Sequence, residues 1–422
     1  MHIRSKRTFL LTLLLTTSAT LFFIAISCMK RPTNPTGPIA VKFDNKEDQL
    51  PFSFDVSEIL QDFDSRFALS PFKLDSQSLY RVHESAMVAR NDSSFGNSTV
   101  CLATIASLDH LRWIPELSEH WTGPTSIAVF YRRTLDLRLL VAYLTLLRTC
   151  FKTIGDNFNF HFVTPALQNS TQDDVVLLNS FGVVTCDDHK RLLESFLAVL
   201  KEQKWDMVPF PQNHLRNVAR DGCARSPFFY LTDVDVMPQY GLHRRLDRFL
   251  MHSPPCEKCL YVVPAFEGTE VAEHPRTKKE LLARTGTRKD FRVYHQVAFY
   301  KNQRATNFDK WKRLKGPAEL HAAYEVNFEF GYECFYVGTH DVPKYREIII
   351  GYGFTRNVQT LESYLAGFRF LVLSDAFMIH RGLRSSNWNA PYRNAEKRHN
   401  YHVFLKFRRT LQERYGRGME FT

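Results

Sequence analysis

Short apolar runs alternate with amphipathic stretches between about residue 100 and residue 265 of the 422-residue chain. The apolar runs predict strands that are buried on both faces of a sheet. The stretches between them repeat their apolar positions every three or four residues, which predicts helices. The predicted strands are 100–104, 125–131, 158–163, 175–184, 228–231 and 260–264. The predicted helices are 108–120, 135–151, 189–203, 213–224 and 240–251.

This order of elements predicts an α/β fold, with a mostly parallel sheet that carries helices on both faces. The pattern is less regular after residue 265, and a Phe/Tyr-rich segment covers 324–354. Further helices are predicted at 277–285, 307–314, 357–366 and 395–415, and extended segments at 368–373 and 377–379. No change in composition separates a second domain, so we expect residues 99–422 to form one domain.

The N-terminal segment 9–29 contains no charged residue and is long enough to span a bilayer. Basic residues lie in the preceding segment, so we expect residues 1–8 to stay in the cytoplasm. A cleaved signal peptide is the alternative, but Lys30-Arg31-Pro32 is a poor cleavage context. We therefore expect a transmembrane signal anchor of type II topology at 9–29, followed by a proline-containing luminal stem at 30–98.

The formal charge of the chain is +11, and five of these charges lie in the first 31 residues. The rest is spread too thinly to predict nucleic-acid binding. The glycosylation sequons begin at Asn91, Asn97 and Asn169, and they are meaningful only if they face the lumen. Among the eight cysteines, Cys256 and Cys259 form a CxxC, which is weak evidence for zinc without a second pair. We expect disulfides in a secretory chain, and the sequence leaves their pairing open.

The strand predicted at 228–231 ends in Thr232-Asp233-Val234-Asp235. Ligands of parallel sheets bind beyond the carboxyl ends of the strands, and residues i and i+2 of an extended chain point to the same side. Asp233 and Asp235 can therefore hold a divalent cation, which in turn binds a diphosphate. The alternative is a surface turn in which an aspartate caps the next helix.

Two further groups of polar residues strengthen the cation hypothesis. Asn213, Arg216, Asn217 and Arg220 share one face of the preceding helix and can bind phosphate oxygens, a uracil edge or a sugar carboxylate. A solvated helix face is the alternative. His380 ends a later apolar run and can add an imidazole ligand from a second strand, although a lone histidine there is often structural.

Together these segments resemble glycosyltransferase family 49 over roughly residues 100–415. Their order and spacing carry the resemblance, since no single motif is specific. The matching motifs are 121–124, 213–219, 232–238 with 240–242, 305–311, 333–337, 351–354 and 378–380.

The resemblance implies a GT-A fold, a Mn²⁺ cofactor and an inverting transfer from a UDP-sugar, with UDP-glucuronate as the expected donor. It implies Asp233, Asp235 and His380 as metal ligands. It implies donor contacts from Arg216, Asn217, Arg220 and Asp233. Glu333 and Glu362 occupy acidic positions of the family pattern, which makes them candidates for the catalytic base or for groups that orient the acceptor.

The same resemblance implies a Golgi membrane protein with a luminal catalytic domain. Its expected partners are a UDP-sugar, a xylose-containing O-glycan of a glycoprotein in the O-mannosylation pathway, and other Golgi glycosyltransferases. The chain departs from the family pattern at Cys334, Arg346 and Thr355, which puts the acceptor and the activity in question. The alternatives are a β-1,3-N-acetylglucosaminyltransferase of the same fold and a non-catalytic, membrane-anchored partner of another transferase.

Overall fold

The computed structural model describes residues 53–56, 71–167, 182–201, 209–286, 290–314, 319–384 and 391–416. All of them belong to one compact unit, Asp48–Thr422. The predicted anchor at 9–29, most of the predicted strand at 175–184, and Asn169 lie outside these residues. A helix long and apolar enough to cross a membrane is not found in the part of the chain that the structure describes.

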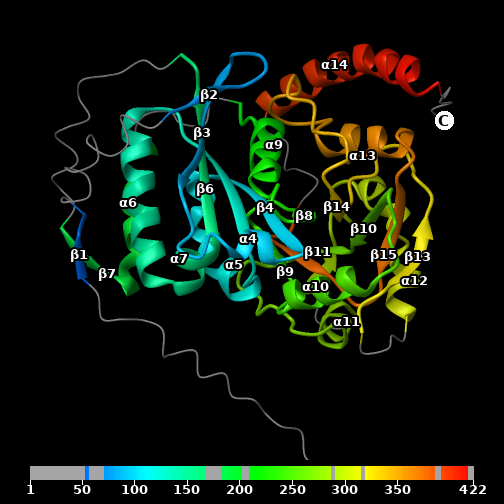
Figure 1. The fold of residues 1–422 in the computed structure, drawn as a ribbon, viewed down its shortest axis with the longest axis horizontal. Helices are drawn as coiled ribbons and strands as arrows, with labels where there is room; N and C mark the ends of the chain where they lie inside the picture. Colours follow the sequence, from blue (N-terminus) through cyan, green and yellow to red (C-terminus); the bar gives the residue numbers. More distant parts are fainter. Residues whose placement is uncertain are drawn as a thin grey trace, which may run out of the picture. The chain divides into compact units, whose positions relative to one another are not determined.

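A ten-stranded mixed sheet is the centre of the described fold (Figure 1). In spatial order its strands are β13 (Ala322–Val326), β15 (Arg369–Leu373), β10 (Cys259–Val263), β14 (Phe335–Thr339), β8 (Phe228–Leu231), β4 (Val100–Ser107), β5 (Thr125–Phe130), β6 (Phe158–Pro165), β3 (Tyr80–Met87) and β2 (Lys73–Leu74). The neighbours β8, β4, β5 and β6 are parallel, as predicted. However, β14 runs antiparallel to both β8 and β10, and β2, β3 and β13 form antiparallel edges. The α/β class is confirmed, but the sheet is mixed and not mostly parallel.

Both faces of the parallel strands are buried, and successive side chains enter two separate hydrophobic clusters. In β4, Val100 and Leu102 belong to one cluster, while Cys101 and Ala103 belong to the other. Alternation of this kind follows from the period of two in a strand. It explains why these segments appear in the sequence as continuous apolar runs.

Helices cover both faces of the sheet. One face packs against α5 (Ile114–His120), α6 (Thr134–Cys150), α8 (His189–Lys201) and α10 (Leu242–His252). The other packs against α9 (Gln212–Gly222), α11 (Lys278–Gly286) and α12 (Phe308–Arg313). Figure 1 shows α6 and α9 on opposite sides of β4. A third cluster joins α13 (Arg356–Leu365) to α14 (Pro391–Tyr415). The shorter helical segments are η1 (Leu108–Trp113), α4 (Ser94–Asn97), α7 (Lys152–Asn157), η3 (Cys186–Asp188), η5 (Tyr300–Asn302) and η6 (Arg304–Thr306).

Smaller sheets complete the described fold. One pairs β1 (Ser53–Asp55) with β7 (Val183–Thr185). The other contains, in spatial order, β12 (Phe291–Val293), β11 (Ala265–Gly268), β16 (Met378–Arg381) and β9 (Val236–Pro238). Because β9 begins directly after Asp235, and antiparallel pairing sets His380 of β16 opposite Val236, this second sheet joins the two segments predicted to hold a cation.

The expected stem boundary at residue 98 needs correction, because residues 71–98 belong to the folded unit. Strand β3 pairs with β6 in the main sheet, and Tyr80, Val82 and Phe95 are buried. The second half of β3 is largely solvent-exposed or half-buried. A strand with so few buried positions has a weak apolar pattern, which is why the sequence suggested a linker.

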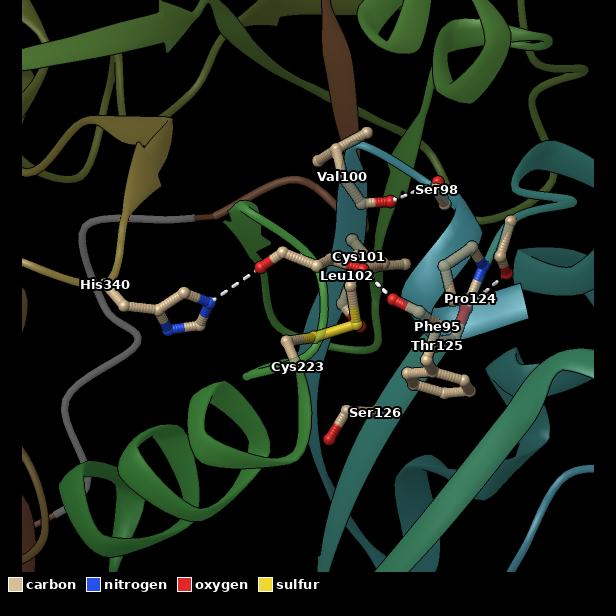
Figure 2. Close-up of a disulfide and its surroundings, with 12 residues drawn as sticks. Phe95, Ser98, Val100, Cys101, Leu102, Pro124, Thr125, Ser126, Cys223 and His340 are labelled. Carbon is tan, nitrogen blue, oxygen red and sulfur yellow. Dashed lines mark hydrogen bonds between the residues drawn. A yellow bond between two sulfur atoms is a disulfide. The ribbon is translucent and has the colours of Figure 1, made fainter. Parts of the chain in front are cut away.

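Three disulfides link elements of the described fold, as expected for a secretory chain. Cys101 in β4 bonds to Cys223 directly after α9, and Figure 2 shows the bridge reaching from the helix end to the sheet. Cys150 bonds to Cys186. Cys256 bonds to Cys259, so the CxxC forms a disulfide. Cys334 is the free cysteine of the described residues, and it is buried.

Candidate active site

A cavity of about 610 Å³ opens at the carboxyl ends of β4 and β8. The residues after β4 contribute Asp109 and His110, and those after β8 contribute Asp233 and Asp235. The volume is in the usual range for a small-molecule site. The position is the one that the rule for parallel strands predicts. Other elements supply the remaining charged or hydrogen-bonding groups, among them Arg216, Tyr294, Lys301, Glu333, Thr355, Arg356, His380, Arg384, Arg393, Glu396 and Lys397.

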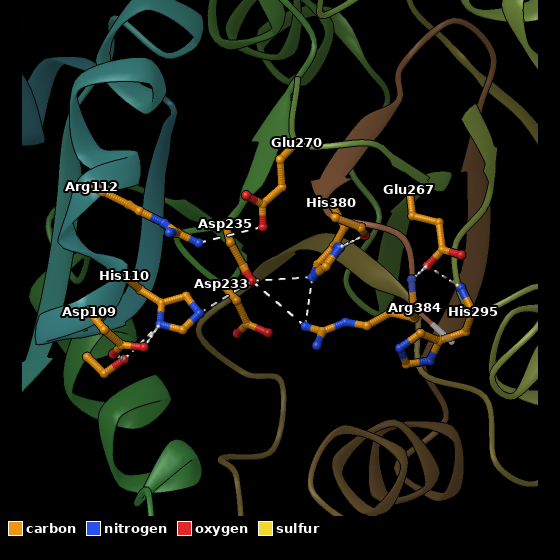
Figure 3. Close-up of polar contacts among 12 residues, drawn as sticks. Asp109, His110, Arg112, Asp233, Asp235, Glu267, Glu270, His295, His380 and Arg384 are labelled. Atoms are coloured by element: carbon orange, nitrogen blue, oxygen red, sulfur yellow. Dashed lines mark hydrogen bonds and ion pairs between the residues drawn. The ribbon is translucent and has the colours of Figure 1, made fainter. Parts of the chain in front are cut away.

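Asp235 and His380 meet in this cavity (Figure 3). His380 Nε2 lies 3.3 Å from Asp235 Oδ2, and both side chains are largely buried. On the other side of the carboxylate, His110 Nε2 lies 4.0 Å from the same oxygen. Burial by itself would raise the pKa of Asp235. The hydrogen bond and charge of His380, with help from His110 and Arg384, outweigh it and hold the pKa well below its usual range. Asp235 is therefore an anion at neutral pH.

The donor set around Asp235 fits a divalent cation. His380 Nδ1 lies 2.8 Å from the carbonyl oxygen of Gly382, and a carbonyl accepts only a protonated nitrogen. This bond keeps a proton on Nδ1, so Nε2 is the nitrogen that would give up its proton to bind a cation beside Asp235, as in many metal-binding histidines. The carboxylate oxygen and imidazole nitrogen are donors that Mn²⁺ accepts. In the structure a cationic group already faces them, since Arg384 Nη2 is 2.7 Å from His380 Nε2 and 3.9 Å from Asp235 Oδ2.

Asp233 lies in the same cavity but faces different partners. Its Oδ1 is 2.7 Å from Arg356 Nη2 and 3.1 Å from Arg216 Nη2. Burial would raise the pKa of Asp233, but these two guanidiniums lower it. Among the described residues, Asp233 does not join Asp235 and His380 in a group whose ligand atoms all lie within 4.8 Å of one another. Of the three predicted metal ligands, Asp235 and His380 thus lie together, whereas Asp233 forms ion pairs with Arg216 and Arg356.

The polar face of α9 divides between two roles. Arg216 lines the cavity, whereas Asn213, Asn217 and Arg220 are buried outside its lining. The Asn217 amide donates to the carbonyl oxygen of Tyr345 at 2.9 Å, and Arg220 donates to the carbonyl oxygen of His340. Of the predicted donor-binding residues on this helix, the structure therefore brings only Arg216 to the cavity. The others hold the segment that follows β14.

The structure separates the two candidate bases. Glu333 lines the cavity, and Asn302 Nδ2 donates to its Oε2 at 2.8 Å. Burial raises the pKa of Glu333 to about 7, although Arg356 and Arg216 oppose the rise. Such a carboxyl can take up a proton near neutral pH. Glu362 lies outside the lining. It is 1% exposed and bonds to Arg346 and to Arg414, so it holds α13, α14 and the segment before them together.

The departures from the family pattern also lie in different places. Thr355 lines the cavity, but Arg346 forms its ion pair with Glu362 and stacks on Phe407 of α14. The free thiol of Cys334 is buried in the second hydrophobic cluster. Only Thr355 is therefore placed to contact a bound molecule. Asn91 and Asn97 are exposed, as glycosylation requires.

Several cavity residues escaped the sequence analysis. Asp109 and His110 directly follow β4, so the rule for strand ends could have found them. His110 Nδ1 lies 3.0 Å from Asp109 Oδ2. Arg384 is placed by its own backbone, whose N–H donates to buried Glu267 at 3.3 Å. Arg356 begins α13, and no local pattern marks it out, because only the tertiary fold sets it beside Asp233.

Comparison with known proteins gives consistent matches over the folded unit. The family described as "Glycosyl-transferase for dystroglycan" matches residues 99–416. Beta-1,4-glucuronyltransferase 1 of Homo sapiens is 30% identical over 346 residues, which cover 81% of each chain. The Danio rerio protein of the same name is 29% identical over 75% of this chain and 74% of its own. Xylosyl- and glucuronyltransferase LARGE1 of Mus musculus is 26% identical over 82% of this chain but only 39% of its own length.

Proposed function

The chain belongs to the family of glycosyl-transferases for dystroglycan, and from this premise we propose that it transfers glucuronate from UDP-glucuronate to a xylose-containing O-glycan. That it is a glycosyltransferase follows from the family and from its relatives. The observation that carries the finer proposal is the meeting of Asp235 and His380 in a cavity rich in arginine and lysine. A nucleotide sugar with an acidic sugar ring presents a diphosphate and a carboxylate, and this lining is complementary to both.

The charges of the cavity support an anionic donor. Arginine and lysine side chains outnumber carboxylates in the lining. Arg216 and Arg356 are nearly inaccessible to solvent and have fixed positions on α9 and α13. Guanidiniums suit phosphates and carboxylates because they can donate two parallel hydrogen bonds. Asp233 holds both guanidiniums in place before the donor binds, which lowers the entropic cost of binding.

Asp235 and His380 are the residues that would hold Mn²⁺. A bound Mn²⁺ would neutralise the charge that builds up on the departing diphosphate. The Gly382 carbonyl keeps a proton on Nδ1 of His380, so Nε2 is the nitrogen that would bind the cation. Arg384 lies beside the same two groups and is suited to bind either a phosphate oxygen or the sugar carboxylate.

Glu333 is the group that would accept the proton of the acceptor hydroxyl. In a single displacement the hydroxyl oxygen attacks C1 of the sugar, the bond from C1 to UDP breaks, and the hydroxyl proton passes to Glu333. The configuration at C1 inverts in this step. The bond from Asn302 fixes the carboxylate, and the raised pKa makes it a stronger base than an exposed glutamate.

We also propose that the catalytic domain works in the Golgi lumen, anchored by the apolar segment 9–29. Three disulfides support an oxidising compartment. The exposed sequons Asn91 and Asn97 agree with that side of the membrane. A complex with other Golgi glycosyltransferases belongs to the same proposal, as does the O-mannosylation pathway of the acceptor.

A donor panel tests the function. The purified full-length chain is incubated with UDP-glucuronate, UDP-xylose or UDP-N-acetylglucosamine, with a xyloside acceptor, and with or without Mn²⁺. We expect acceptor-dependent release of UDP from UDP-glucuronate, a product of inverted configuration, and loss of turnover without Mn²⁺.

The matched control is Asp375→Asn, because Asp375 forms an ion pair with Arg245 outside the cavity lining. Turnover with UDP-N-acetylglucosamine alone would select the β-1,3-N-acetylglucosaminyltransferase. Absence of turnover with every donor would favour a non-catalytic partner. Equal turnover of the Asp235→Asn variant and the unchanged chain would rule out the proposed cation site.

A further inference from the structure

A second group of metal-ligand side chains lies outside the cavity. Asp75 is in the turn between β2 and β3, His214 is in α9, and Glu347 is in the segment that follows β14. One ligand atom from each of these residues lies within 4.8 Å of the other two. His214 and Arg216 are two residues apart on α9, which turns them to opposite faces of the helix. The group is thus separate from the cavity that Arg216 lines.

The distances suit a small cation. His214 Nε2 lies 3.1 Å from Asp75 Oδ2 and 4.0 Å from Glu347 Oε2. Tetrahedral Zn²⁺ with bonds of about 2.0–2.1 Å places its ligand atoms about 3.3–3.4 Å apart. The first separation is slightly shorter than this value and the second is longer, so Glu347 would have to move closer to His214 to complete the coordination. The side chains are also well shielded, with 1% of His214, 5% of Asp75 and 21% of Glu347 exposed.

Hydrogen bonds hold the two carboxylates in position without neutralising them. Asp75 accepts from the backbone N–H groups of Leu79 and Tyr80 at 2.6 and 2.7 Å. Glu347 accepts from Ser76 Oγ and Asn217 Nδ2, both at 2.9 Å. These donors are all neutral. Within the described residues, no arginine or lysine forms an ion pair with either carboxylate.

The charge balance of the group therefore calls for a cation. A neutral imidazole has one N–H and can donate it to only one of the carboxylates, which leaves two negative charges in a shielded place. A neutral ring has a lone pair to offer a metal, and one imidazole with two carboxylates is a donor set that Zn²⁺ accepts.

We propose that Asp75, His214 and Glu347 form a Zn²⁺ site, with a water molecule completing the coordination on the exposed side of Glu347. The metal would clamp the turn between β2 and β3 and the segment after β14 onto α9. The same segment after β14 receives the Asn217 hydrogen bonds, and α9 carries Arg216 to Asp233. The site would therefore stabilise the wall of the cavity from behind without touching a bound substrate.

Metal content of the full-length Asp235→Asn chain tests this inference, because that substitution weakens the cation site of the cavity. The protein is loaded with Zn²⁺, dialysed and analysed by mass spectrometry for bound metal. We expect one equivalent of Zn²⁺. Adding His214→Gln or Glu347→Gln is expected to remove it and to abolish the increase in melting temperature that Zn²⁺ produces. The latter variant keeps an acceptor for Ser76 and lies near the surface, so its fold should persist.

His243→Gln is the matched control, since His243 Nε2 lies 3.2 Å from Asp247 Oδ2 and no second carboxylate of the described residues completes a group there. It should retain the metal. Co²⁺ supplies an independent readout, because its visible absorption reports ligand number and should disappear with Glu347→Gln. The inference is overturned if the Asp235→Asn chain binds no Zn²⁺, or if the His214→Gln and His243→Gln variants retain equal amounts. These measurements report bound metal and not UDP-sugar turnover. Their outcome therefore does not depend on whether the proposed function is correct.

Discussion

His380 Nε2 lies 3.3 Å from Asp235 Oδ2 because antiparallel pairing of β16 with β9 sets His380 opposite Val236, the neighbour of Asp235. The backbone N–H of Arg381 also donates to the carbonyl oxygen of Asp235 at 2.9 Å. Strand register thus aligns two side chains from distant parts of the sequence more rigidly than loops would. This arrangement sets the expectations for substitutions in the cavity.

Replacement of Asp235 by Asn should lower Mn²⁺-dependent turnover by at least about 100-fold, because the amide offers no negative charge to the cation. The overall fold should persist, since the side chain keeps its size. Initial rates across a Mn²⁺ titration measure the effect, and Asp375→Asn should leave them unchanged. If the Asp235→Asn variant reached the same maximal rate at the same Mn²⁺ concentration as the unchanged chain, Asp235 would not be a metal ligand.

Replacement of Glu333 by Gln should lower kcat by about 100-fold to 10,000-fold while the affinity for UDP changes little. The amide cannot accept a proton, but it fills the same space beside Asn302. Glu329→Gln is the control, because Glu329 belongs to the same segment and forms an exposed ion pair with Arg304. Retained kcat in the Glu333→Gln variant, with UDP binding followed by calorimetry, would exclude Glu333 as the base.

The pH dependence should report the same carboxyl group. Burial raises the pKa of Glu333 to about 7, and only its ionised form can accept the hydroxyl proton. Turnover should therefore be low below pH 7, where Glu333 is protonated, and should rise to a plateau as the pH increases through about 7. The residual activity of Glu333→Gln should lack this dependence, which a profile of kcat between pH 5 and pH 9 would reveal.

Replacement of Glu362 by Gln should act on stability and not on chemistry. The buried carboxylate bonds to Arg346 and Arg414, which are 30% and 51% exposed on their side chains. Because water can reach both guanidiniums, the loss should be about 1–3 kcal/mol of unfolding free energy. Urea unfolding measures it, with Glu325→Gln as the exposed-pair control. A large loss of kcat in fully folded Glu362→Gln protein would instead indicate that Glu362 takes part in catalysis.

Removal of the Cys101–Cys223 disulfide should destabilise the chain more than removal of Cys256–Cys259. The first bridge closes a sequence separation of 122 residues and the second a separation of 3. A longer closed loop restricts the unfolded chain more, so the first double Ala variant should lose about 2–5 kcal/mol. Chemical unfolding of both double variants without reductant tests the order, and the reverse order would contradict the loop-entropy explanation.

The sequence was sufficient for the parts of the fold that depend on local burial. Strands β4, β5, β8 and β10 carry apolar residues on both faces, so continuous apolar runs revealed them, whereas β6 alternates apolar residues with buried Asn159 and His161. The helical period revealed α6 and α9. The sequence pattern could not reveal β3, because this strand has few buried residues. It also could not show that β14, in the Phe/Tyr-rich segment, runs antiparallel through the middle of the sheet. Strand direction within a sheet depends on long-range pairing, which a local pattern does not contain.

The same limit applies to the cavity. The sequence by itself determined that Asp233 and Asp235 follow a buried strand and that Arg216 shares a helix face with other polar residues. Only the tertiary structure decided that Arg216 is the one of the four predicted polar residues of α9 that reaches the cavity. It also decided that Glu333 lines the cavity while Glu362 pairs with arginines, and that Arg356 meets Asp233. Periodicity specifies which way a side chain points from its own element. Which distant element it then meets is set by strand register and helix packing, and these exist only once the chain has folded.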